Sequence, residues 1–102
     1  MKKTLGTHNY YVYVLTNQSK KVLYIGVTNH LKRRLEEHST PVESSRHFTN
    51  KYNCRYLLYF EHFNCIETAI KREKQLKKWS RPKKEALISS LNPKWDFLNE
   101  TI

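Results

Sequence analysis

The sequence predicts an α+β fold: a small three-stranded antiparallel sheet flanked by helices, in the order β-β-α-β-α-α. Three short segments rich in aromatic and β-branched residues predict the strands, and apolar residues at helical spacing predict the helices. A length of 102 residues fits one compact domain. We therefore expect a single domain over residues 1–102, with its core at about 10–97.

The first two strands should form an antiparallel hairpin. Residues Tyr10–Leu15 and Val22–Val27 are strongly apolar, and the polar residues 16–21 between them predict a turn. Both strands are apolar on alternate and on intervening positions. This pattern indicates burial on both faces of the sheet, or aromatic rings that reach a cleft.

The first helix is expected from about His30 to His38, with Thr28 or Asn29 as its N-cap. A long polar loop at 39–53 should follow it. Helical periodicity turns one stripe of this helix toward the core. The stripe consists of Leu31, Arg34, Leu35 and His38.

A third strand at Cys54–Glu61 should precede a second helix from about Cys65 to Trp79. Asn64, followed by Glu67, resembles a capping box and predicts the start of that helix. The remaining elements are a third helix at 82–90, begun by a proline, and a closing segment at 92–98 that folds back on the core.

Glu73 stands on the core-facing stripe of the second helix, whose other members are apolar. A buried carboxylate costs several kcal/mol unless it is paired or binds a cation. Arg34 and His38 hold inward positions on the first helix. Two interpretations stay open: a buried Arg34–Glu73 ion pair, or a cleft in which carboxylate, guanidinium, imidazole and phenol groups handle phosphate. The apolar members of the stripe are Ile66, Ala69, Ile70 and Leu76.

The formal net charge of +10 favours a polyanionic partner, nucleic acid above all, although an anionic membrane or simple solubility also fits it. Glu73 is the one acid in a long basic run, which suits a metal near phosphate or, alternatively, a solvated helix face. No apolar run is long enough to span a membrane, and two cysteines suit a reducing cytosol, so we expect a cytoplasmic protein. The basic residues of the run are Lys71, Arg72, Lys74, Lys77, Lys78, Arg81, Lys83 and Lys84.

Two further candidate sites carry less weight. A zinc site is not supported, because the spacing of the cysteines and histidines contains no CxxC pair. The strand aromatics, Phe60 among them, are expected in the core. A base-stacking ring is expected instead in the polar loop, at Phe48 or Tyr52.

The ordered motifs resemble those of the GIY-YIG endonuclease superfamily over residues 10–97. Tyr11-Val12-Tyr13 stands for the GIY tripeptide, and Tyr24-Ile25-Gly26 is the YIG tripeptide. Residues 28–38 match a T-x-x-L-x-x-R-x-x-x-H helix, and residues 69–79 resemble the helix that carries the metal-binding Glu. The chain is most similar to compact bacterial stand-alone members, which are described as excinuclease-C-like or YhbQ-like.

The resemblance implies a role for each matching residue. The phenols of Tyr13 and Tyr24 would line the site, and one of them would act as general base or orient the attacking water. Arg34 would hold the scissile phosphate, and His38 would assist proton transfer or contact phosphate. Glu73 would be the sole carboxylate ligand of one divalent metal ion, Mg²⁺ or Mn²⁺.

Supporting roles fall to Gly26 and to Asp96, which stands where many members of the family have Asn, with Asn92 close by. Val27 replaces a Lys that some members carry. The expected nucleic-acid-binding residues are Lys32, Arg33, Lys71, Arg72, Lys74, Lys77 and Lys78.

The resemblance thus implies a metal-dependent endonuclease that hydrolyses phosphodiester bonds in DNA. It would be structure- or damage-directed, would serve repair or recombination, and would act as a monomer or weak homodimer. The alternative is a nucleic-acid-binding module with the same fold and little or no cleavage. A basic partner-binding protein would explain the charge, but not the inward positions of Arg34, His38 and Glu73.

Overall fold

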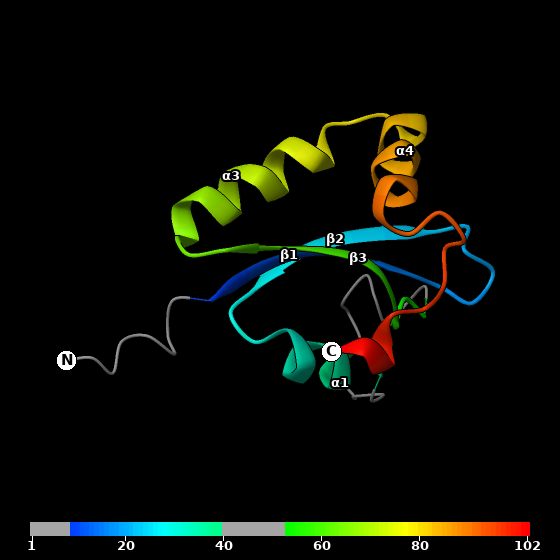
Figure 1. Cartoon of the computed structure of the whole chain (residues 1–102), viewed down its shortest axis with the longest axis horizontal. Helices are drawn as coiled ribbons and strands as arrows, with labels where there is room; N and C mark the ends of the chain where they lie inside the picture. The colour runs from blue at the N-terminus through cyan, green and yellow to red at the C-terminus, as the bar shows by residue number, and fades with distance from the viewer. Residues whose placement is uncertain (1–8, 40–52) are drawn as a thin grey trace.

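A three-stranded antiparallel sheet in the order β2-β1-β3 forms the centre of the molecule (Figure 1). The computed structural model describes residues 9–39 and 53–102. Phe48 and Tyr52 of the expected loop lie outside the described residues. The observed order confirms the predicted α+β fold. The elements are β1 (Tyr10–Thr16), β2 (Leu23–Thr28), α1 (Leu31–Ser39), β3 (Tyr56–Phe63), α3 (Ile66–Lys77), α4 (Arg81–Leu91) and the short 3-10 helix η2 (Asn99–Thr101).

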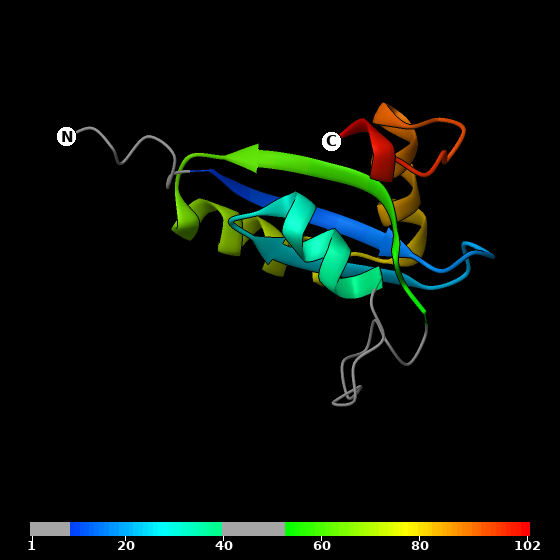
Figure 2. The ribbon, with the colours of Figure 1, turned by 90° about the horizontal axis from the view of Figure 1, so that it is seen from below.

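Helices cover both faces of the sheet, as the continuous apolar character of the strands predicts. Helices α3 and α4 lie on one face, and α1 and η2 lie on the other (Figures 1 and 2). Side chains of β1 alternate between the two, with Val12 and Val14 facing α3 while Tyr13 and Leu15 face α1. The sheet therefore separates two cores, each about one side chain deep.

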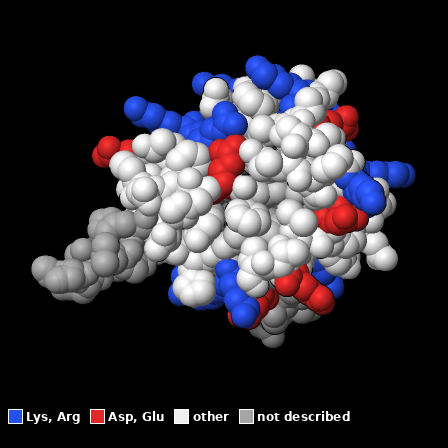
Figure 3. All heavy atoms as spheres, in the orientation of Figure 1, with Lys and Arg blue, Asp and Glu red and all other residues white. Residues whose placement is uncertain are grey.

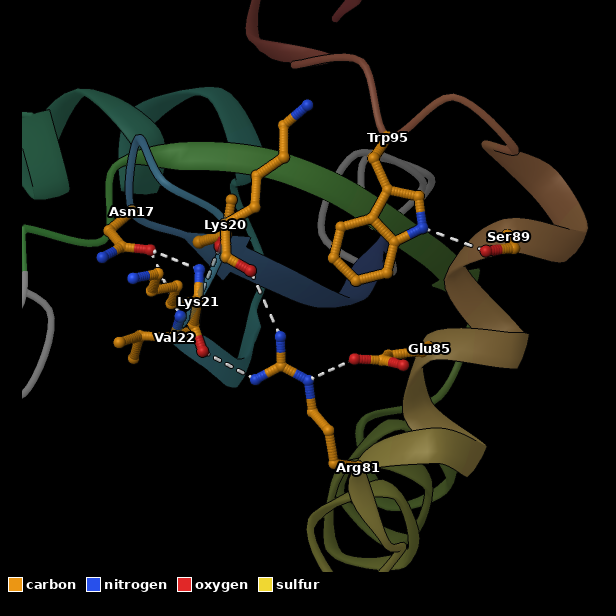
Figure 4. Close-up of polar contacts among 9 residues, drawn as sticks. Asn17, Lys20, Lys21, Val22, Arg81, Glu85, Ser89 and Trp95 are labelled. Carbon is orange, nitrogen blue, oxygen red and sulfur yellow. Dashed lines mark hydrogen bonds and ion pairs between the residues drawn. The ribbon is translucent and has the colours of Figure 1, made fainter.

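The β1–β2 turn is organised by its own polar residues. The Asn17 side-chain oxygen accepts hydrogen bonds from the backbone N–H groups of Lys21 (3.0 Å) and Val22 (3.2 Å). From α4, the Arg81 guanidinium donates to the carbonyl groups of Lys20 and Lys21, as Figure 4 shows. These contacts hold α4 against the β1–β2 hairpin.

Both predicted helix caps are shifted along the chain. His30 caps α1, because its ring Nδ1 accepts from the Arg33 backbone N–H at 3.3 Å. Thr28 instead receives the His30 N–H at 3.1 Å, just before the helix. Helix α3 has Cys65 at its N-cap, so the capping box expected at Asn64 is wrong by one residue. The proline in the first turn of α4 is where the sequence predicts it.

The buried line of α3 runs through Ala69 and Leu76, which are 0% and 1% exposed. At about 100° per residue, Glu73, Ile66 and Ile70 lie progressively farther round on one flank of that line. The predicted burial of the two isoleucines is therefore wrong: Ile66 is 40% exposed and Ile70 is 36% exposed. Their flank extends past the sheet instead of lying on it.

The chain end folds back on the core, as predicted. The Leu98 backbone N–H donates to the Leu57 carbonyl at 2.7 Å. The Asn99 side chain bonds β3 as well, to the Leu57 N–H (2.8 Å) and the Arg55 carbonyl (2.9 Å). Within the described part of the chain, every helix is too short or too polar to cross a membrane.

Candidate active site

The absence of a side chain at Gly26 makes room for Tyr13. The two residues are paired in the register of β1 and β2. A Cβ atom at position 26 would lie 2.5 Å from Tyr13 Oη and 2.6 Å from Tyr13 Cζ, closer than unbonded atoms approach. Tyr13 itself is only 1% exposed. Gly26 is therefore required for the space that it leaves beside the phenol.

Tyr24 lies on the same face of the hairpin as Tyr13. The two ring centroids are 6.2 Å apart with the planes inclined at 43°. A hydrogen bond connects the two side chains. Tyr24 is half-buried, whereas Tyr13 is enclosed, so the pair leads from the core toward the outer edge of β2.

Arg34 approaches this pair from α1. Its Nη1 lies 3.2 Å from Glu37 Oε1, and its side chain is 42% exposed. Its Nε is buried and has no hydrogen-bond partner among the residues that the structure describes. With Arg33, it lines one side of a cleft of about 330 Å³, and Ile66 lines the same cleft from α3. A guanidinium so placed offers donors to an anion that enters the cleft.

Glu73 approaches the Tyr13 phenol from the opposite layer, although it does not line the Arg34 cleft. Its side chain is 14% exposed, and Oε2 lies 2.7 Å from Lys77 Nζ. The carboxylate is close enough to Tyr13 to raise the pKa of that phenol. The predicted inward position of Glu73 is thus confirmed. The alternative prediction, a buried ion pair between Arg34 and Glu73, is wrong. The Arg34 guanidinium pairs with Glu37, and the Glu73 carboxylate pairs with Lys77.

The electrostatics of Tyr13 bring the four predicted residues together. Burial is the largest cause that raises the pKa of Tyr13, and the charge of Tyr24, their hydrogen bond and the charge of Glu73 raise it further. The Arg34 guanidinium acts in the opposite direction. At neutral pH Tyr13 is therefore protonated in the free protein, and its hydroxyl is a hydrogen-bond donor.

Most of the predicted basic residues are exposed and cluster over the helices. Figure 3 shows Lys and Arg side chains gathered at the top of the molecule, over α3 and α4. Two of the predicted residues form ion pairs within their own helices, Lys77 with Glu73 at 2.7 Å and Arg33 with Glu37 at 3.8 Å. The exposed members of the predicted set are Lys32, Arg33, Lys71, Lys74, Lys77 and Lys78.

Arg72, one of the residues expected to bind nucleic acid, forms contacts within the fold. It lies on the other flank of α3 from Glu73, where its Nε and Nη2 donate to the two carboxylate oxygens of Glu61, each at 2.9 Å. The guanidinium also lies 5.3 Å from the centroid of the Trp79 ring. Its side chain is 24% exposed. Arg72 therefore fastens α3 to β3, a contact that no periodicity in the helix itself can predict.

The structure does not group Asp96 with the tyrosines. Its backbone carbonyl and N–H bond the Asn92 side chain, which also donates to the Leu58 carbonyl of β3 at 2.9 Å. Asp96 is exposed and lies beside β3, with β1 between it and β2. Asn92 is the buried amide of this segment, at 6% exposure. The side chain of His38 lies outside the described residues.

Sequence reasoning missed the immediate partners of both charged site residues. Glu37 and Lys77 stand three and four positions after Arg34 and Glu73. These are the spacings at which side chains meet on a helix surface, so the signal was present.

Comparison with known proteins places the chain among relatives of its own size. The family profile described as "GIY-YIG catalytic domain" matches residues 9–86. A UPF0213 protein of Syntrophus aciditrophicus is 35% identical over 83 residues, which cover 81% of this chain and 92% of that protein. A UPF0213 protein of Natronomonas pharaonis is 35% identical over 81 residues, which cover 79% and 92%.

A solved structure agrees with the fold. The solution NMR structure of a UPF0213 protein from Bacillus halodurans superposes with a TM-score of 0.54 at 28% identity, and the match covers 91% of this chain and 93% of that one. The family match spans the hairpin, the Arg34 helix and the Glu73 helix. The chain therefore belongs to the GIY-YIG nuclease family.

Proposed function

We propose that this protein is a metal-dependent endonuclease that hydrolyses phosphodiester bonds in DNA. It acts in the cytoplasm on branched, nicked or damaged DNA, during repair or recombination. The observation that carries the proposal is the convergence of Tyr13, Tyr24, Arg34 and Glu73 near the Tyr13 phenol, from the four elements β1, β2, α1 and α3. Guanidinium, phenol and carboxylate groups in one place are the components of a phosphate-handling site.

Arg34 is the phosphate-binding residue of this proposal. Its buried Nε has no hydrogen-bond partner among the described residues, and its Nη1 contacts only the exposed carboxylate of Glu37 there. A phosphate in the cleft can take these donors, and two parallel N–H···O bonds would fix its orientation. The positive charge then offsets the negative charge that develops on the phosphate oxygens in the transition state.

The two phenols position the reacting groups. Tyr13 is held in place by Gly26 and by its hydrogen bond with Tyr24. Because Tyr13 keeps its proton at neutral pH, it can donate its one hydrogen bond to Tyr24 and so fix the Tyr24 hydroxyl relative to the phosphate and the attacking water. Tyr24, nearer to solvent, orients that water for attack. His38, whose predicted role is proton transfer or phosphate contact, stays part of the proposal.

The residues present fit one divalent cation of the Mg²⁺ or Mn²⁺ type. Such ions prefer oxygen ligands and keep several waters, so one carboxylate can suffice. In the described part of the chain, no group of three or more His, Cys, Asp or Glu side chains gathers. The proposal assigns the ion to Glu73, because Glu37, the carboxylate that lines the Arg34 cleft, is paired with Arg34. The Lys77 side chain is 52% exposed and can turn away into solvent. When bound, the ion would supply positive charge and lower the pKa of water.

A cleavage assay tests the proposal. Single-stranded, nicked and branched DNA are incubated with the purified protein in Mg²⁺, in Mn²⁺ or in EDTA. We expect cleavage with either metal and none in EDTA. Arg34→Ala and Glu73→Ala should each lower the rate about 100-fold or more. Glu67→Ala, which removes an exposed carboxylate from the same helix, is the matched control and should cleave normally.

Two results would contradict the proposal in different ways. Cleavage that survives both Arg34→Ala and Glu73→Ala would remove these residues from the site. Salt-dependent DNA binding without cleavage on any substrate would leave the nucleic-acid-binding module as the function, since phosphate contacts alone make affinity fall with salt.

A further inference from the structure

A second cavity, of about 420 Å³, lies on the α1 face of the sheet and has no part in the proposed chemistry. Figure 2 shows that α1 and η2 leave the arrowhead end of β3 uncovered on this face. The cavity volume is within the range of pockets that hold small ligands, about 300 to 1,000 Å³. The uncovered end of the sheet is therefore large enough for a ligand of nucleobase size.

Three aromatic rings from two neighbouring strands form an exposed platform here. Tyr11 of β1 is paired in register with His62 of β3, and their ring centroids are 5.2 Å apart. Phe60 lies 6.3 Å from Tyr11, edge to face, and lines the cavity with it. Tyr11 and Phe60 are half-buried and His62 is exposed. Phe60 packs against the core on the α1 face, as expected of a core residue, and it also lines the cavity.

Polar groups surround this platform. Asn9 and Asn29 line the cavity with their amides, and Lys32 adds a positive charge. The Asn9 side-chain oxygen lies 2.7 Å from His62 Nε2, which orients the amide at the rim. Aromatic faces with amides at the rim are the groups that hold unpaired nucleobases, by stacking and by hydrogen bonds to their edges.

Asn29 connects this cavity with the Arg34 cleft. It lines both, so the two cavities are neighbours at the loop between β2 and α1. A nucleotide whose phosphate lies against Arg34 would have its neighbouring base within reach of Tyr11 and Phe60. A base that is paired in a duplex cannot stack on these rings, because its faces are already covered.

We propose that this cavity binds an unpaired nucleobase of single-stranded DNA next to the phosphate held by Arg34. The inference rests on the proposed function and adds to it a reason for selecting unpaired DNA. Because the planes of Phe60 and Tyr11 are inclined at 68°, the base stacks on one of the two rings and meets the other at its edge, with Asn9 and Asn29 bonding the base edge. Stacking accepts any base, so the site selects for the absence of pairing instead of for a sequence.

The test compares two oligomers that carry the same charge. Fluorescence anisotropy in EDTA, where no cleavage occurs, measures the Kd of a short oligothymidylate and of an abasic oligomer of equal length. We expect the full-length protein to bind the base-bearing oligomer about 5-fold more tightly or better. Phe60→Leu keeps an apolar side chain but removes the ring, and should bring that ratio close to one. Phe63→Leu, on the same strand and packed with the other core, should leave it unchanged.

The outcomes separate this inference from the proposed function. If the wild type binds both oligomers equally, the base site is overturned while DNA binding stands. If it binds neither, both are overturned. Should Phe60→Leu fail to fold, His62→Ala replaces it, since that ring is exposed. His62→Ala should lower the ratio as well, and an unchanged ratio would overturn the base site.

Discussion

Two carboxylates, Glu61 and Glu73, are buried to nearly the same degree and are each bound by a basic residue of α3. Glu61 is 18% exposed and Glu73 is 14% exposed. Glu61 receives two hydrogen bonds from Arg72 and a third from the Tyr59 hydroxyl at 2.5 Å. Glu73 has one ion pair, with Lys77, at 2.7 Å.

The difference separates a structural carboxylate from one that can take a ligand. A bidentate guanidinium is rigid and cannot leave Glu61 without stranding a half-buried charge. A lysine ammonium is a point charge on a flexible stem, so Glu73 can exchange it for another cation. Arg72 and Glu73 are consecutive, and they lie on opposite flanks of the buried line of α3. One flank is thereby fixed to β3 and the other is open to the site beside β2.

The largest effect on stability and on cleavage is expected from filling the space beside the Tyr13 phenol, near Glu73. Gly26→Ala places a methyl group against the Tyr13 phenol, and overpacking of this kind costs about 1 to 3 kcal/mol of stability. A displaced phenol should also lower cleavage about 100-fold, because a shift of about 1 Å is enough for that. Chemical denaturation and initial cleavage rates measure the two effects. Wild-type behaviour in both would show that the contact is relieved elsewhere.

Breaking the contact between Arg72 and Glu61 should lower stability and leave the cleavage chemistry unchanged. Arg72→Met removes the charge-assisted hydrogen bonds to Glu61 but keeps an apolar stem over Trp79, so we expect a loss of about 1 to 3 kcal/mol in the free energy of unfolding. Urea denaturation measures it. A larger fall in cleavage than in the folded fraction would contradict the structural role of this pair.

The Glu61–Arg72 pair should also make the free energy of unfolding depend on pH in the acid range. Burial alone would raise the pKa of Glu61, but the hydrogen bonds from Arg72 and Tyr59 and the Arg72 charge hold it below the usual carboxyl range. The stabilisation is therefore complete above the unfolded carboxyl pKa of about 4.3 and is lost as the pH falls through the lower, folded value. Melting temperatures from neutral pH down through this window should fall less steeply for Glu61→Gln than for wild type. Parallel curves would show that Glu61 is not the group that titrates.

The smallest of the expected effects is a change in metal affinity when Lys77 is replaced. Lys77→Met removes the ammonium that competes for Glu73, and a half-exposed ion pair is worth at most about 1 kcal/mol. The affinity for Mn²⁺, measured calorimetrically without DNA, should therefore rise up to about 5-fold. Lys78→Met, exposed and next in sequence, is the matched control. A lower affinity in the Lys77 variant would mean that the lysine does not compete for Glu73.

The sequence was sufficient for the features that depend on local pattern. The hairpin follows from two apolar runs around a polar turn, and the inward position of Glu73 follows from the period of its helix. Contacts between different elements could not be predicted in this way. Arg72 of α3, for example, bonds Glu61 of β3, which stands eleven residues earlier in the chain. The exposure of Ile66 and the partial burial of Phe60 likewise depend on how the neighbouring elements pack. Only the three-dimensional packing decides that.

The most direct test of the account compares Glu73→Gln with Glu61→Gln in one cleavage assay with Mg²⁺, at a temperature where both variants are folded. Glu73→Gln should melt like the wild type and cleave at least about 100-fold more slowly. Glu61→Gln should melt at a lower temperature and cleave at the wild-type rate. If Glu73→Gln cleaves like the wild type, or Glu61→Gln is the variant that loses cleavage, the open site beside β2 is not where the chemistry occurs.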